Sequence, residues 1–182
     1  MSHYRIFAVL VVLLLFGCSA TTTTPKTHYY LLTSQQPAIS TRPLAPLPHI
    51  QVECAAYLSQ AGLVNELPQQ QIETAHYHRW AEPLPAMMRR YLQRALQQRC
   101  PDTALAPNIT LVVDQFHHLS SGAVVFAGQW WSASTPPVSF VRQQATADNS
   151  YPTTVAALQD LLNQQADQIA RTLCPTFPQS AE

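Results

Sequence analysis

Residues 109–143 read ITLVVDQFHHLSSGAVVFAGQWWSASTPPVSFVRQ and contain three apolar runs. The runs cover residues 109–116, 123–131 and 138–143, and turn-forming residues around Gly122 and Pro136-Pro137 separate them. Runs rich in β-branched and aromatic residues, bounded by such turns, are typical of β-strands. The segment therefore predicts an antiparallel meander of three strands.

The second run ends in two tryptophans, Trp130 and Trp131. Consecutive strand residues point to opposite faces of a sheet, so only one of these rings is expected to enter the core. The other is expected on the opposite face, either at an interface or in edge packing.

An amphipathic helix is predicted immediately before this segment. Pro83 and Pro85 are compatible with a helix only in its first turn, so the helix is expected to begin near Glu82. Apolar residues then recur every three or four positions until Pro101, namely Leu84, Met88, Tyr91, Leu92, Ala95 and Leu96. A carboxylate is stabilised at a helix N-terminus, so Glu82 is interpreted as a capping residue rather than a general acid.

A second amphipathic helix is predicted after the meander, beginning at residues 150–152. Its apolar stripe contains Val155, Leu158, Leu162, Ala166, Ile169 and Leu173. Each short connection reverses the chain, so two helices separated by three strands are expected to run in the same direction. The predicted fold class is α+β, an antiparallel β-sheet with two parallel amphipathic helices packed on one face.

Four cysteines occupy positions 18, 54, 100 and 174. Cys100 and Cys174 each follow a predicted helix, and parallel helices end at the same end of a domain, so a disulfide between them is expected. It would enclose residues 101–173, a loop for which chain-entropy models give about 4 kcal/mol of stabilisation. The alternative is three reduced, partly buried cysteines, with Cys54 acting as a small hydrophobic residue on a strand.

The N-terminus resembles a bacterial lipoprotein signal. Residues 6–16 are apolar but too few for the roughly 20 residues that span a bilayer. Leu15 and Gly17 suit cleavage before Cys18, whereas Phe16 departs from the usual pattern, and an ordinary secretory signal is the alternative. We expect a signal peptide at 1–17, a flexible tether with lipidated Cys18 at 18–27, one domain at 28–175 and a tail at 176–182.

Short strands are predicted between the tether and the first helix. They lie at residues 29–33, around Ile50 and Val52, and at residues 71–74. Four prolines between residues 37 and 48 predict an extended, irregular crossing between the first two of these strands.

Composition argues against several classes of function. Ten basic residues balance ten acidic ones and charged residues make up 11% of the chain, so the overall charge predicts no electrostatic attraction to nucleic acid or to an anionic membrane surface. With four glycines there is no phosphate-binding loop or nucleophile elbow, and we assign no catalytic residue and no cofactor.

The seven histidines raise the alternative of a zinc site. His76 and His78 are two residues apart, and His117 is adjacent to His118. No neighbouring Cys, Asp or third His completes a ligand set of recognised spacing. We therefore assign no metal site and interpret these residues as ordinary surface or half-buried histidines.

Several segments of the chain form a distributed pattern. They are the signal ending in Cys18, His28-Tyr29-Tyr30-Leu31-Leu32, the strand around Ile50 with Tyr57-Leu58 and Gly62-Leu63-Val64, Arg79-Trp80-Ala81-Glu82-Pro83-Leu84, and residues 109–116 followed by Val124, Gly128 and Trp130. In this order they resemble the PqiC-like lipoproteins, auxiliary subunits of MCE-type and ABC-type lipid transport systems. The extra cysteines and the proline-rich stretch are departures from that family.

This resemblance implies a noncatalytic lipoprotein, anchored by lipid in the outer membrane and facing the periplasm. Ser19, where an inner-membrane lipoprotein commonly has Asp, agrees with that location. The resemblance further implies a ring-like homo-oligomer that docks a PqiB-like MCE tunnel protein and supports lipid transport and membrane integrity. The alternatives are a lipoprotein that binds peptidoglycan or activates a wall synthase and, less favoured, a periplasmic metal-dependent hydrolase.

Overall fold

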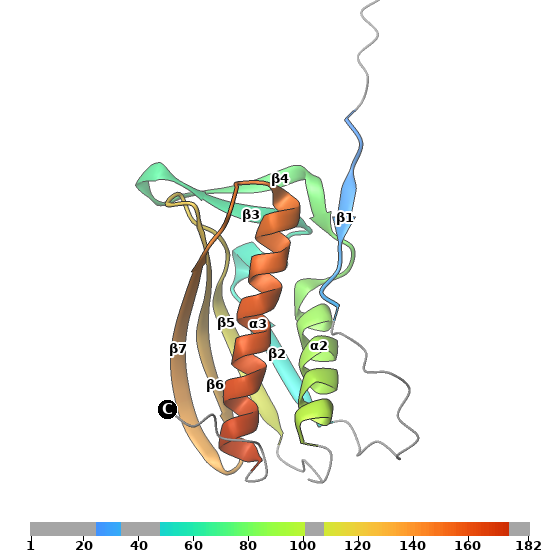
Figure 1. Cartoon of the computed structure of the whole chain (residues 1–182), viewed down its shortest axis with the longest axis vertical. Helices are drawn as coiled ribbons and strands as arrows, with labels where there is room; N and C mark the ends of the chain where they lie inside the picture. The colour runs from blue at the N-terminus through green and yellow to red at the C-terminus, as the bar shows by residue number, and fades with distance from the viewer. Residues whose placement is uncertain (1–24, 34–47, 101–107, 175–182) are drawn as a thin grey trace, which may run out of the picture.

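The computed structural model of the chain describes residues 25–33, 48–100 and 108–174, in which a sheet carries two helices on one face (Figure 1). The strands are β1 (His28–Tyr30), β2 (Ile50–Cys54), β3 (Gly62–Leu67), β4 (Gln71–Trp80), β5 (Ile109–His118), β6 (Ala123–Ser132) and β7 (Thr135–Ala145). The helices are α2 (Leu84–Arg99) and α3 (Tyr151–Leu173), and short 3-10 helices at Ala56–Ser59 and Pro68–Gln70 flank β3.

The seven-stranded sheet is mixed, so the prediction of a purely antiparallel sheet was wrong. The meander of β5, β6 and β7 is antiparallel as predicted. By contrast, β1 pairs in parallel with β4, and β2 pairs in parallel with β5. Strand β3 also makes a short parallel contact with the end of β5, where Asn65 is opposite His118. Parallel neighbours need a long crossover rather than a hairpin, and the chain between the members of each of these pairs supplies one.

The two helices run side by side in the same direction, as predicted (Figure 1). Their apolar stripes are buried against the sheet. The start of α3 is capped by Ser150, whose Oγ accepts a hydrogen bond from the Thr153 N–H at 3.4 Å.

The predicted cap at Glu82 was wrong. Helix α2 begins at Leu84 with Pro83 as its N-cap, and no side chain caps its N-terminus. The Glu82 carboxylate instead lies 2.6 Å from the guanidinium of Arg90, near the middle of the helix. An ion pair with a long arginine side chain has therefore replaced the expected dipole interaction.

The C-terminal ends of the helices are joined by a disulfide between Cys100 and Cys174. Their Cα atoms are 6.0 Å apart, within the usual range for a disulfide, and both residues are buried. At the same end Arg99 Nε lies 2.5 Å from the carboxylate of Asp167, and Arg99 also donates to Asn163 at 2.6 Å. Cys54 is a free thiol, and burial raises its pKa to about 12.

Strands β5 and β6 approach each other closely at Gly128. A Cβ added there would lie 2.0 Å from the carbonyl oxygen of Val112, beside a bulge in β5 between Val113 and Gln115. Only a glycine leaves room for this approach.

The two tryptophans of β6 lie on opposite faces of the sheet, as the alternation predicts. Trp130 is fully buried, while Trp131 is half-buried on the opposite face.

Two strand boundaries differ from the predictions. Strand β4 continues to Trp80 rather than ending near residue 74, because it pairs with β1 as well as β3. Strand β7 includes Pro136 and Pro137, which the sequence pattern placed in a turn. β7 is an edge strand, and both prolines lie at the register shift opposite Trp131, where the regular ladder of hydrogen bonds is interrupted.

Candidate functional site: a groove beside strand β2

Strand β2 has an open backbone edge in the described part of the chain. His49 O accepts a hydrogen bond from Ile109 N at 3.0 Å, and Ala55 N donates to Val113 O at 2.9 Å, so both ends of β2 bond to β5. Alternate residues of a strand direct their backbone groups to opposite sides, so Ile50, Val52 and Cys54 direct theirs away from β5. Within the described ranges these groups have no backbone partner, and such an edge can pair with another chain.

A groove of about 710 Å³ lies between this edge and helix α2. Its volume is within the range of typical ligand pockets. The apolar lining consists of Ile50, Val52, Pro83, Pro85 and Ala86, and the polar lining of His49, Gln51, Arg89, Arg90 and Gln93. The side-chain amide of Gln93 donates to the Pro48 carbonyl at 3.0 Å, which fixes the start of β2 against the helix.

The charge of the groove is positive. The hydrogen bond from Arg90 holds the pKa of Glu82 below its ordinary value, so this pair is ionised and neutralises itself. Arg89 is exposed and has no ion-pair partner among residues 25–33, 48–100 and 108–174. The groove thus offers unpaired backbone groups, an apolar lining and one unneutralised guanidinium.

The structure separates the family-motif residues named from the sequence into three places. Trp80, Leu84, Gly128 and Trp130 are buried in the core. Glu82 and Pro83 lie at or beside the groove, and Tyr29, Tyr30 and Leu31 belong to β1 and the residue after it. The family-motif residues therefore lie partly in the core and partly on two separate surfaces.

Histidine and tyrosine side chains attach β1 to the domain. The hydroxyl of Tyr30 lies 2.8 Å from Nδ1 of His78, and the His78 ring stacks on Tyr151 at 3.8 Å between centroids. The His28 ring also stacks with His78, with 5.1 Å between the centroids. Desolvation and the nearby His28 lower the pKa of His78, which favours the neutral imidazole in this stack.

A second histidine, His117, is buried beneath Tyr57. The Tyr57 hydroxyl donates to the Asp114 carbonyl at 2.8 Å and lies 3.1 Å from Nδ1 of His117. Burial lowers the pKa of His117 more than Glu66, 3.6 Å away, raises it. Neither histidine cluster gathers metal ligands, because in the part of the chain described here no three His, Cys, Asp or Glu side chains converge as a metal site would require.

Apart from Pro83, the residues that line the groove were not identified as site residues from the sequence. His49 and Arg89 are 40 positions apart, and nothing in their local patterns links them. The adjacent arginines 89 and 90 on a predicted helix were the available signal, but a pair of surface arginines is unspecific.

The described helices contain none with the length and apolarity that crossing a bilayer requires. The described residues thus form an α+β domain with a buried core and a groove beside the edge of a strand.

The chain belongs to the family of ABC-type transport auxiliary lipoprotein components, whose model matches residues 30–170. It is therefore an auxiliary lipoprotein of an ABC-type transport system, held to a membrane by lipid, in a family that is not a known enzyme family. The lipidation site expected at Cys18 lies outside the described residues.

Two solved structures share the fold. A crystal structure of an uncharacterized protein is 24% identical, with a TM-score of 0.68, covering 81% of this chain and 99% of the other. A Xanthomonas campestris protein of family DUF330 is 15% identical, with a TM-score of 0.62, covering 80% of this chain and 95% of the other. No curated protein matches the sequence significantly.

Proposed function

We propose that this lipoprotein is the outer-membrane subunit of a PqiABC-like MCE transport system. There it holds the end of a PqiB-like tunnel, contributes to lipid transport between the inner and outer membranes, and supports membrane integrity. Membership of a family of ABC-type transport auxiliary components supports the transport role. The signal ending at Cys18, followed by Ser19, supports an anchor in the outer membrane with the domain on its periplasmic face.

The groove beside β2 is the observation that carries the docking role. An extended segment of the tunnel protein would add to the open edge of β2 through main-chain hydrogen bonds. Apolar side chains of that segment would contact Ile50 and Pro85, and a carboxylate would meet Arg89. Backbone pairing would supply affinity, while the apolar lining and the guanidinium would supply specificity.

The open face of the sheet supports a ring-like homo-oligomer. Val112, Trp131 and Val141 lie on the face opposite the helices, and Val141 is 71% exposed. A ring of identical subunits needs two complementary surfaces on each copy, and this face is proposed as one of them.

A substitution on this face tests the ring. Val141→Glu should lower the oligomer mass measured by native mass spectrometry. Gln164→Glu, at an exposed position of α3, should leave it unchanged.

A matched pair of charge reversals tests the docking role. Arg89→Glu should weaken binding of the purified tunnel protein about tenfold or more, a loss of roughly 1.4 kcal/mol. Arg94→Glu carries the same charge change at an exposed position of α2 that does not line the groove, and should change affinity less than about twofold. Equal effects of the two substitutions would contradict the assignment of the groove.

Cellular and biochemical measurements distinguish the transport role from the alternatives. Deleting the gene, alone or with sister transport systems, should increase permeability and detergent sensitivity. Co-sedimentation with sacculi in place of binding to the tunnel protein would favour a peptidoglycan-binding lipoprotein. Stoichiometric zinc with hydrolytic activity lost on substitution of His78 would favour the hydrolase.

A further inference from the structure

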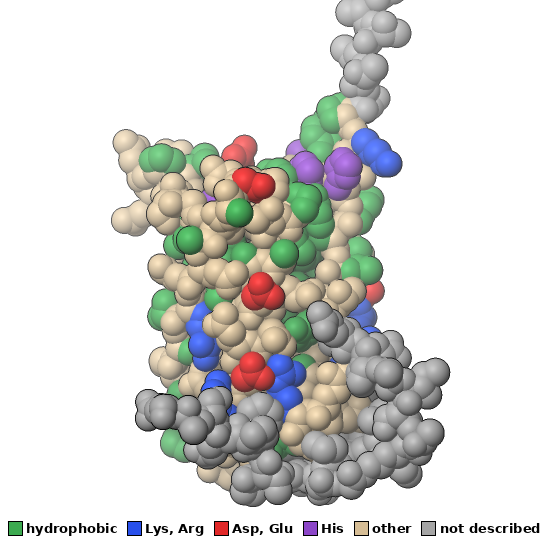
Figure 2. Space-filling model, in the orientation of Figure 1, with side chains coloured by type: hydrophobic (Ala, Val, Ile, Leu, Met, Phe, Trp, Pro, Cys, Tyr) green, Lys and Arg blue, Asp and Glu red, His purple; other side chains and the backbone are tan. Residues whose placement is uncertain are grey.

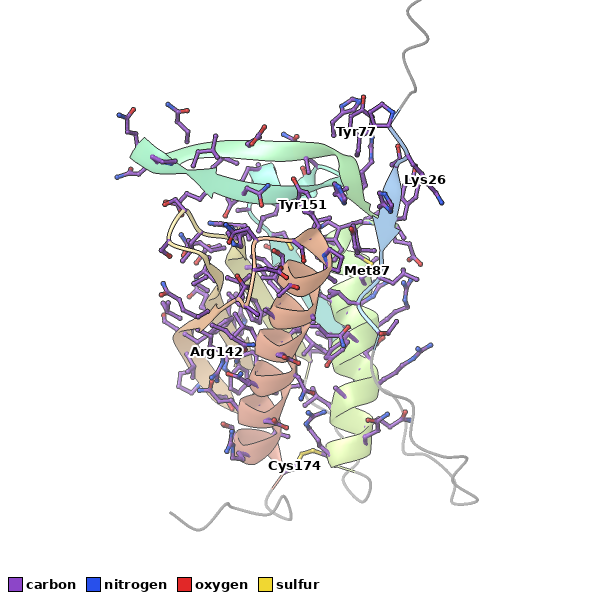
Figure 3. The ribbon with its side chains drawn as sticks, turned by 45° about the horizontal axis from the view of Figure 1, so that its top comes forward. Lys26, Tyr77, Met87, Arg142, Tyr151 and Cys174 are labelled. Carbon is purple, nitrogen blue, oxygen red and sulfur yellow. A yellow bond between two sulfur atoms is a disulfide. The ribbon has the colours of Figure 1, made fainter. Side chains whose placement is uncertain are left out.

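The described part of the chain begins at one end of the domain. Pro25 leads into β1, and β1 begins at the end where the β3–β4 hairpin lies, opposite the end of the helices that carries Cys174 (Figures 1 and 3). From Cys18 to His28 the chain spans at most about 35 Å even when fully extended. Because the family is lipid-anchored, the membrane lies within that distance of β1.

The exposed apolar side chains concentrate at this same end. The described residues include six exposed large hydrophobic side chains, and five of them lie in β1, the residue after it, or the β3–β4 hairpin. They are Tyr29 at 65%, Leu31 at 49%, Leu67 at 36%, Ile72 at 45% and Tyr77 at 36% exposure. Single exposed apolar residues need no explanation, whereas a group beside a lipid tether points to a contact.

Tyr29 and Tyr77 are both exposed and lie on the paired strands β1 and β4. In the parallel register His28 is opposite His78 and Tyr29 is opposite Arg79. His78 stacks on both His28 and Tyr151 of α3, so the alternation turns Tyr29 and Arg79 to the other side, away from the helix. Tyr77, just before the paired residues 78–80 of β4, lies at the end of the domain where β1 begins (Figure 3).

Two basic residues lie close to Tyr29. Lys26, the single lysine of the sequence, is three residues before it, Arg79 is its partner in the β1–β4 register, and neither cation has an ion-pair partner in the ranges that the structure describes. Figure 2 shows a blue side chain beside purple histidines and green side chains at the end of the domain where β1 begins. Tyrosine rings with flanking Lys and Arg favour the headgroup region of a bilayer, where phosphates and apolar chains meet.

We infer that Tyr29 and Tyr77, with Lys26 and Arg79, form a membrane-contact patch that rests on the phospholipid headgroups beside the lipid anchor. The patch fixes the orientation of the domain and keeps the helix ends with Cys100 and Cys174 pointing away from the bilayer. This inference depends on the lipid anchor of the family and not on the tunnel docking proposed above.

Depth-dependent quenching tests the patch in the full acylated lipoprotein. The protein carries a polarity-sensitive fluorophore at Tyr77→Cys and is reconstituted in vesicles of phosphatidylethanolamine with a minority of phosphatidylglycerol. Gln164→Cys, at an exposed position of α3 outside the patch, the groove and the open face of the sheet, is the control. Cys54→Ala removes the native free thiol from both variants. Spin-labelled lipids should quench the probe at position 77 at least about threefold more than the probe at position 164.

Equal quenching at the two positions would overturn the inference. A probe at position 77 that reports an apolar environment but is not quenched by the spin-labelled lipids would also overturn it, because a second copy of the chain would then cover the patch. If Tyr77→Cys does not fold, as judged by circular dichroism, Tyr29→Cys provides a second labelled position with 65% exposure. In a protein labelled there, Lys26→Glu with Arg79→Glu should reduce the quenching, because the headgroup phosphates would lose their cationic partners.

Discussion

Reduction of the Cys100–Cys174 disulfide is predicted to destabilise the domain by about 4 kcal/mol. The bridge joins residues with a sequence separation of 74, and the chain-entropy relation for a loop of this length gives about 4.4 kcal/mol at 25 °C. Reduction removes no packing atoms, so the loss arises from the greater freedom of the unfolded chain. This is a large share of the roughly 5–15 kcal/mol by which domains are usually stable.

Urea unfolding of the lipoprotein with and without reductant measures this loss. With a slope of about 2 kcal/mol per molar urea, the midpoint should fall by roughly 2 M on reduction. The slope itself should rise, because an unbridged unfolded chain exposes more surface. In thermal unfolding the same loss corresponds to a decrease of roughly 10–15 °C in Tm.

Two variants serve as controls for the reductant. Cys54→Ala keeps the bridge and should retain the full response, since Cys54 is not bonded. The double variant Cys100→Ser with Cys174→Ser should start near the stability of the reduced protein and show no response. The reasoning is refuted if reduction moves the midpoint of the native sequence by less than about 0.5 M, or if reductant shifts the double variant equally.

Three further predictions follow from the packing and the pKa shifts. Gly128→Ala should reduce the free energy of unfolding by roughly 1–3 kcal/mol in urea titration, because its Cβ would meet the Val112 carbonyl; unchanged stability would show that the strand can move. His78 and His117 have lowered pKa values in the folded state, so the folded protein binds fewer protons than the unfolded chain. Stability should therefore be complete above the ordinary histidine pKa of about 6.5 and decline as pH falls below it, and a flat stability profile between about pH 7 and 5 would contradict the assignment. The pKa of Cys54 is raised to about 12, so iodoacetamide at neutral pH should modify this thiol far more slowly in the folded than in the urea-unfolded protein, as followed by mass spectrometry; equal rates would contradict burial of the thiol.

The repetitive elements of the fold could be predicted because local periodicity encodes them. The apolar spacing of α2 and α3 and the alternation in β5 to β7 are properties of adjacent residues, so their type and order followed from the chain. The relative direction of the two helices could also be predicted, because each short connection reverses the chain and three strands between two helices leave the helices parallel. That geometry brought Cys100 and Cys174 to one end, where the structure joins them.

The parallel strand pairs could not be predicted in the same way. β1 and β4, or β2 and β5, are separated by long segments that place no limit on which strand becomes the neighbour. The choice depends on which apolar face is left uncovered once the meander and helices have packed. Local rules also failed where two interactions competed, as at Glu82, which pairs with Arg90 instead of capping the helix.

By itself the sequence determined the class of fold, the two amphipathic helices, the antiparallel meander and the absence of any recognised catalytic motif. Tertiary structure alone decided that the sheet is mixed, that β2 keeps an open edge beside Arg89, and that Tyr29 and Tyr77 are both exposed on strands that pair with each other. The physical reason is the distance along the chain over which each signal acts. Periodicity acts over a few residues along the chain, whereas a groove or a surface patch is formed by side chains that only packing of distant segments brings together.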